Sequence, residues 1–117
     1  MRERRLLHNG RLLAARVFAC ETFLERARGV TLRRPMQAHA IVKIAPCAGV
    51  HTVGLHDPID VVFTNREGRV LRCVHELQPW RAAVCGRAFV AWEMPRGMCR
   101  RLSIRPGDRL DDAPPRP

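Results

Sequence analysis

Two strand-like runs joined by a short turn constrain the fold of this chain more than any other feature of its sequence. Residues 59–64 are rich in β-branched and aromatic side chains, and residues 69–77 return with a similar composition. Between them, Asn65 to Gly68 supplies a turn whose final glycine suits a positive φ. Pro79 ends the second run, because proline cannot donate a hydrogen bond to a sheet. The pattern predicts an antiparallel hairpin in the middle of the chain.

Further runs bounded by glycine or proline predict more short strands. They cover residues 12–20, 39–45, 50–55 and 86–94. The last run is apolar almost throughout, which is typical of a strand that is buried on both faces. A Pro-Gly turn later in the chain precedes a short closing strand at residues 109–110.

Two short helices are also expected. Thr22, with Glu25 three residues later, forms a capping box, and Gly29 ends the helix that follows. The apolar residues of 96–103 recur at helical spacing. The predicted fold class is therefore mostly β with a minor α part. We expect a small antiparallel β-sandwich, a jelly-roll-like fold or a distorted barrel with two short helices.

The chain length suits a single domain, because 117 residues leave little room for a second core. Residues 1–11 are polar and arginine-rich, and we expect a flexible basic N-terminal tail there. Residues 111–117 are Pro-rich and predict a disordered tail. The single β-rich domain is expected over residues 12–110.

The charge of the chain is strongly positive, with 21 Lys and Arg against 11 Asp and Glu and a net charge of +10. Lys43 is the only lysine, and the arginines are scattered rather than gathered into a basic arm. Only 5% of the residues are aromatic, so few rings are present to stack on bases. A nonspecific polyanion binder therefore stays open, whereas specific recognition of nucleic acid is not favoured.

The sequence shows neither the uninterrupted apolar segment of a signal peptide nor an apolar run long enough to span a membrane. We therefore expect no membrane span and a location in the cytoplasm. In that compartment the five cysteines would be reduced thiols.

Several short motifs occur in an order that is similar to a known family. They are Cys47 to Thr52, Pro58 to Phe63, Gly68 to Leu71, Pro79 to Arg81 with Cys85, Glu93 to Gly97, and Ile104 to Arg109. Together they resemble domain-of-unknown-function family 192 over residues 12–110. The resemblance implies a compact, mostly β fold of sandwich or jelly-roll type, no assigned reaction, and relatives that are often exported. It also implies a disulfide between Cys47 and Cys85 in an oxidising compartment.

A group of polar and aromatic residues near predicted strand ends is the first candidate for a site. Its members are His51, Thr52, Asp60, Trp80 and Arg81. Trp and Arg are frequent at recognition sites, and sandwich domains bind sugars or peptides at one edge. The favoured function is a non-catalytic accessory module that binds a small ligand or a protein partner. No cofactor is predicted.

Two chemical alternatives use overlapping residues. Cys47, His51 and Asp60 have the residue types of a nucleophile, a base and an orienting acid, which predicts a thiol-dependent hydrolase. Cys47 and His51 together with Cys73 and His75 provide a ligand set for tetrahedral zinc, so the enzyme alternative centred on Cys47, His51 and Asp60 could also be a metal-dependent hydrolase. Neither set has the spacing of a standard motif, so an enzyme is the less favoured interpretation.

Overall fold

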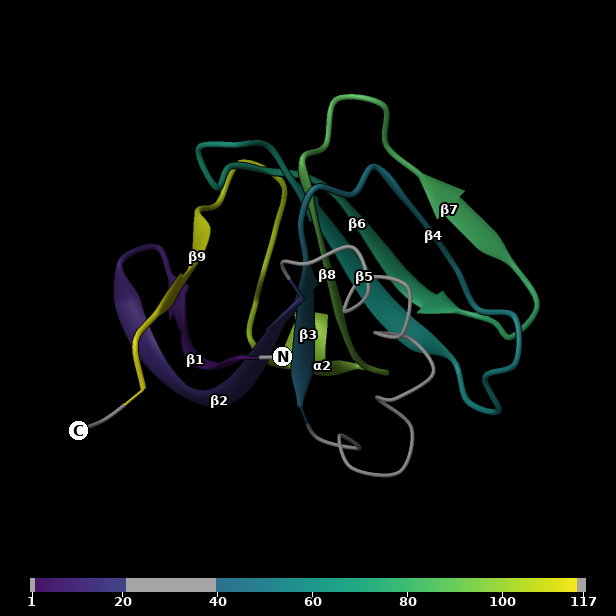
Figure 1. Ribbon diagram of the computed structural model, residues 1–117, viewed down its shortest axis with the longest axis horizontal. Coiled ribbons are helices and arrows are strands. Elements are labelled where there is room, and N and C mark those ends of the chain that lie inside the picture. The colour runs from purple at the N-terminus through teal and green to yellow at the C-terminus, as the bar shows by residue number, and fades with distance from the viewer. Residues whose placement is uncertain (1, 21–39, 116–117) are drawn as a thin grey trace.

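The structure is a computed structural model that describes residues 2–20 and 40–115 (Figure 1). Within these residues it contains nine strands and one short helix. The strands are β1 (Arg2–His8), β2 (Arg11–Cys20), β3 (Ile41–Ile44), β4 (Gly49–His51), β5 (Ile59–Thr64), β6 (Val70–Leu77), β7 (Ala82–Val84), β8 (Val90–Pro95) and β9 (Leu110–Ala113), and the helix is α2 (Met98–Arg101). The mostly β fold class is confirmed.

Seven strands form one curved sheet in the order β6-β5-β8-β3-β2-β1-β9, and β4 pairs with β7 in a separate two-stranded sheet. Figure 1 shows the small sheet on the β5 and β6 side of the molecule, with β1, β2 and β9 on the opposite side. The sheet is mixed rather than purely antiparallel, because β2 and β3 run parallel. Between its two edge strands, β6 and β9, the structure has an isolated bridge from Arg69 to Arg109 instead of a continuous ladder. The sheet is therefore not closed into a barrel.

The core lies on both faces of the large sheet. On the inner, concave face Trp92 of β8 packs with Leu6, Val17 and Val62 from three other strands. On the outer face, Ala91 of β8 packs in a second cluster with residues of β4, β5 and β7. The expectation that β8 is buried on both faces is therefore confirmed, and its burial leaves only the last residue partly exposed. The second cluster holds the small sheet onto the large one.

Four expectations about the ends and helices of the chain have different outcomes. Residues 2–8 form β1 instead of a flexible tail, because β1 is hydrogen-bonded to β2 on one side and β9 on the other. Likewise β9 extends to residue 113, into the segment expected to be a disordered tail. The helix expected at residues 96–103 is confirmed as α2. The helix expected at residues 22–29 lies outside the described residues.

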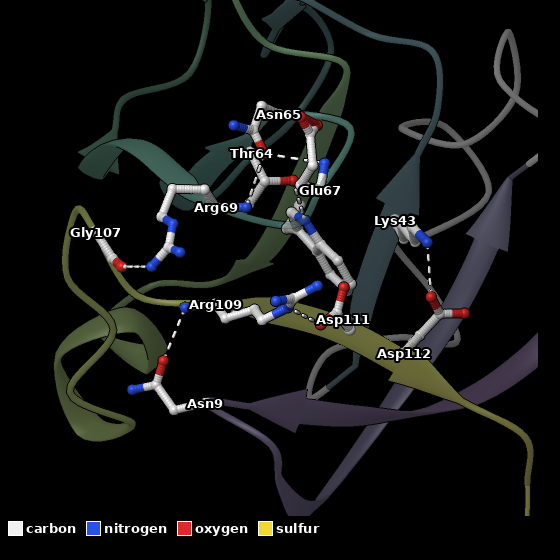
Figure 2. Close-up of polar contacts among 11 residues, drawn as sticks. Asn9, Lys43, Thr64, Asn65, Glu67, Arg69, Gly107, Arg109, Asp111 and Asp112 are labelled. Atoms are coloured by element: carbon white, nitrogen blue, oxygen red, sulfur yellow. Dashed lines mark hydrogen bonds and ion pairs between the residues drawn. The ribbon is translucent and has the colours of Figure 1, made fainter.

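A polar seam joins the turns at the two edges of the large sheet (Figure 2). The Arg69 guanidinium donates to the Gly107 carbonyl at 2.6 Å, and its backbone N–H donates to Asn65 Oδ1 at 2.9 Å. From the other side, the Arg109 N–H donates to Asn9 Oδ1 at 2.8 Å. In these bonds, side chains pair with backbone N–H and C=O groups of the turns. The seam therefore holds the two edges of the sheet close together.

An ion-pair cluster on Asp112 ties β9 to the other strands of the sheet. Its carboxylate accepts hydrogen bonds from Lys43 Nζ at 2.6 Å and from Arg4 Nε at 2.7 Å, and 11% of the side chain is exposed. Burial alone would raise the pKa of Asp112, but the hydrogen bonds from Lys43 and Arg4 outweigh it and hold the pKa below its usual value.

Asp112→Asn is expected to lower the free energy of unfolding by about 1–3 kcal/mol at neutral pH, because the variant loses two charge-assisted bonds. The depressed pKa means that the carboxylate stabilises the fold above its unfolded-state pKa of about 3.9, and that this contribution is lost as the pH falls further. Denaturant unfolding at several pH values should therefore show a steeper acid loss in the wild type than in the variant.

The neighbouring Asp111→Asn is the control for this prediction. Asp111 is 41% exposed and pairs only at 3.2 Å with Arg109, so its replacement should change the free energy of unfolding by less than about 0.5 kcal/mol. Equal effects of the two replacements would contradict the role assigned to Asp112.

Candidate functional site

Asp60 lies inside the fold rather than in an open pocket. Its side chain is on β5 and is fully buried. One carboxylate oxygen accepts the Glu76 N–H at 2.9 Å, and the other accepts the Cys99 N–H at 3.0 Å. Glu76 has a φ of 52° at an irregularity in the β5–β6 pairing, and Cys99 is in the first turn of α2. Asp60 therefore anchors a strand distortion and the start of a helix.

Thr52, Trp80 and Arg81 lie together just beyond the paired ends of β4 and β7. The buried Thr52 hydroxyl donates to the Gln78 carbonyl at 2.6 Å and accepts the Arg81 N–H at 2.8 Å. The Thr52 carbonyl also accepts the Trp80 N–H at 3.1 Å. Through these contacts Thr52 holds the loop of residues 78–81 in place. Trp80 is 65% exposed, so its ring stands on the surface beside this loop.

The structure does not bring together the full residue set of either chemical alternative. Cys73 packs against the inner core cluster, whereas Cys47 packs against the clusters on the outer face. His75 is exposed on β6. Among residues 2–20 and 40–115, no group of three or more His, Cys, Asp and Glu side chains is placed to hold a metal ion. Asp60 points to the inner face and does not join Cys47 and His51.

Cys47 and His51 do share a pocket, and its third polar member is Glu93. The pocket has a volume of about 160 Å³ and lies between β3, β4 and β8. We call it the β4 pocket. Its lining residues are Ile44, Pro46, Cys47, Gly49, Val50, His51 and Glu93.

Glu93 is placed by the pairing of three strands. In the sheet it stands opposite Val42 of β3 on one side and Val61 of β5 on the other, and its side chain is fully buried. Moving a carboxylate from water into the interior of a protein is costly, so a buried carboxylate is usually retained for a specific interaction. The sequence signal was present, because Glu93 is the one charged residue in the apolar run of residues 88–94.

The rim of the β4 pocket carries a thiol and an imidazole. Cys47 Sγ donates to the Gly49 carbonyl at 3.0 Å, and His51 Nδ1 accepts the Val53 N–H at 3.3 Å. Since Nδ1 acts as an acceptor, a neutral His51 ring carries its proton on Nε2. The ring therefore offers a donor rather than a base to whatever lies at Nε2.

Cys47 and Cys85 both pack against the outer core cluster, and no disulfide joins them in the structure. The Cys85 N–H donates to the Ala48 carbonyl at 2.9 Å, which brings the two segments together. The disulfide implied by the family resemblance is thus not formed here. It stays a prediction for an oxidising compartment.

A second thiol pair lies on the inner face and was not foreseen. Cys73 Sγ and Cys99 Sγ both lie within hydrogen-bond distance of the Ile104 carbonyl oxygen, at 3.8 and 3.5 Å. A hydrogen bond from Cys99 lowers the pKa of the Cys73 thiol. The same bond, together with burial, strongly raises the pKa of the Cys99 thiol.

Iodoacetamide is expected to modify Cys73 well before Cys99 in the native protein, because the thiolate is the reactive form and Cys99 is fully buried. Cys99→Ala removes the donor that stabilises the Cys73 thiolate, so it should slow modification of Cys73 near neutral pH. Peptide mapping over a time course measures both rates. Cys85→Ala is the control and should leave them unchanged, whereas equal rates at Cys73 and Cys99 would contradict the assignment.

No helix among residues 2–20 and 40–115 has the length and apolar character needed to cross a membrane.

Comparison with known proteins identifies relatives of the whole domain. A UPF0127 protein of Pyrococcus furiosus is 32% identical over 108 residues, which cover 87% of this chain and 90% of the relative. A UPF0127 protein of Thermococcus sibiricus is also 32% identical, with 87% of this chain and 69% of the relative covered.

Two solved structures share the fold. A protein of unknown function from Novosphingobium aromaticivorans has a TM-score of 0.75 at 20% identity, with coverage of 93% of this chain and 83% of that one. A "putative transcription regulator" from Sinorhizobium meliloti has a TM-score of 0.77 at 21% identity, with coverage of 95% and 94%. The model of the uncharacterised family DUF192 matches residues 5–111, and this chain belongs to that family.

Proposed function

We propose that the protein is a non-catalytic binding module whose ligand occupies the β4 pocket. The observation that carries this proposal is the fully buried Glu93 carboxylate in the wall of a pocket that also presents His51 and Cys47. A few polar groups converging in an otherwise apolar pocket are typical of small-molecule sites. Ile44 and Val50 supply the apolar walls.

The size and chemistry of the pocket limit the ligand. A volume of about 160 Å³ is smaller than the roughly 300 Å³ at which pockets for drug-sized ligands begin. The ligand, or the part of it that enters, is therefore a compact group such as one peptide side chain or a small polar fragment. A hydrogen-bond donor on that group would face the Glu93 carboxylate, and an acceptor would face Nε2 of His51.

A fragment screen followed by amide NMR tests this proposal. The probes are small amines, amides and alcohols with fewer than about ten non-hydrogen atoms. At least one should shift the amide signals of Gly49, Val50 and His51 in a saturable manner. His51→Ala should weaken that binding by about tenfold or more, which is the loss expected for one hydrogen bond in a site.

His75→Ala is the matched control, because His75 is an exposed histidine on β6 that does not line the β4 pocket. It should leave fragment binding unchanged. Failure of every fragment to shift these amides, or equal binding in both histidine variants, would contradict the proposal.

A second candidate function is nonspecific contact with polyanions. Four arginines around α2, Arg96, Arg100, Arg101 and Arg105, are all exposed. The structural relative from Sinorhizobium meliloti carries the name of a transcription regulator, although 21% identity links the two by fold alone. If this function operates, duplex DNA binding should fall steeply with salt, and replacing Arg100 and Arg101 by Gln should reduce that salt dependence. Salt-independent or absent binding would exclude it.

A further inference from the structure

A second pocket opens between β1, β2 and the residues after β9. Its volume is about 300 Å³, which reaches the range typical of small-molecule sites. We call it the arginine pocket. Its walls include Glu3, Arg4, Arg5, Leu13, Ala15 and Arg16.

Two of the three arginines already have a carboxylate partner. Arg4 Nε lies 2.7 Å from Asp112 Oδ2, and Arg16 Nη2 lies 2.9 Å from Glu3 Oε1. Arg5 has no ion pair within the part of the chain that the structure describes. The side chain of Arg5 is nevertheless half-buried, so water screens its charge less than at a fully exposed position.

The strand pairing also places a second arginine next to Arg5. Arg5 of β1 stands directly opposite Arg16 of β2 in the antiparallel pair, so the two side chains leave the same face of the sheet. Like charges in directly opposite positions are destabilising. One acid, Glu3, faces this pair, and it is engaged by Arg16. An anion placed beside Arg5 would relieve the repulsion.

We propose that the arginine pocket binds a small organic anion, whose carboxylate or phosphate group is held by Arg5 and Arg16 and whose short apolar part lies against Leu13 and Ala15. Guanidinium groups present paired N–H donors that match the oxygens of both anions. The arginine pocket shares no lining residue with the β4 pocket, so the two sites stand or fall separately.

Amide NMR titrations at constant ionic strength test the site, because added salt alone would screen the arginines. The probes are butyrate, monobutyl phosphate and, as the uncharged counterpart, butanamide. At least one of the two anions should shift the amides of Arg5 and Ala15 in a saturable manner, and butanamide should not. The tighter of the two anions identifies which oxyanion the pocket prefers.

Arg5→Gln should weaken anion binding by about tenfold or more, because it removes the guanidinium that has no protein carboxylate. Arg11→Gln is the matched control, since Arg11 is an exposed arginine of the same hairpin outside the pocket, and it should bind as the wild type does. Thermal unfolding of both variants checks that each is folded. Absence of saturable shifts with both anions, equal shifts with butanamide, or undiminished binding in folded Arg5→Gln would each overturn the proposal.

Discussion

Asp60→Ala is expected to lower the free energy of unfolding by about 3–5 kcal/mol. The carboxylate is fully buried and accepts the N–H groups of Glu76 and Cys99. Alanine leaves both donors inside the protein without an acceptor, at about 1–3 kcal/mol each. Urea unfolding followed by tryptophan fluorescence measures the loss.

Two further variants show whether this loss comes from the buried hydrogen bonds. Asp60→Asn keeps one carbonyl oxygen as an acceptor, so its loss should lie between those of the wild type and Asp60→Ala. Asp57→Asn changes an exposed carboxylate in the preceding loop and should have little effect. If Asp60→Ala unfolds like the wild type and loses only fragment binding, Asp60 is a ligand contact and its assignment as an anchor is wrong.

Gly68→Ala is expected to cost about 2–4 kcal/mol through two effects that act together. The residue has a φ of +86°, where a side chain costs about 1–2 kcal/mol. An added Cβ would also lie 2.5 Å from Asp111 Oδ1 and 3.0 Å from the Leu110 carbonyl oxygen. Because the second atom belongs to the backbone of β9, the seam between the sheet edges must move to accommodate it.

Gly10→Ala separates the two effects in Gly68→Ala. Gly10 has a similar φ of +79° in the β1–β2 turn, but an added Cβ there meets no atom within 4 Å. Its replacement should therefore show only the conformational cost of about 1–2 kcal/mol. Thermal unfolding of both variants gives the comparison. Equal losses would mean that the close approach of β9 to Gly68 does not matter for stability.

The central hairpin and β8 could be predicted from the sequence because their side chains carry the fold. Residues 59–64 and 90–94 are buried almost throughout, so their apolar composition reports their environment directly. By contrast, β1 holds four charged or polar arginine and glutamate side chains, and its two neighbouring strands hold it by backbone hydrogen bonds. Backbone hydrogen bonds do not depend on the pattern of apolar and polar side chains. The sequence of residues 1–11 therefore predicted a flexible tail instead of a strand.

The site was predictable in part, for a similar reason. The sequence singled out Cys47 and His51, which line one pocket. It could not supply the partners of Asp60, because Glu76 and Cys99 are 16 and 39 residues away and meet it only in the folded chain. Glu93 was visible as a lone charge in an apolar run, but strand pairing was needed to place it beside the pocket.

A crystal structure of the protein soaked with its tightest-binding fragment tests the central claim most directly. The β4 pocket should hold the fragment between Ile44 and His51, with a donor within hydrogen-bond distance of the Glu93 carboxylate. That result would establish the buried carboxylate as the centre of a binding site. A fragment bound only against the exposed Trp80 ring, with the β4 pocket unchanged, would contradict the claim. The binding site would then be the loop that Thr52 holds.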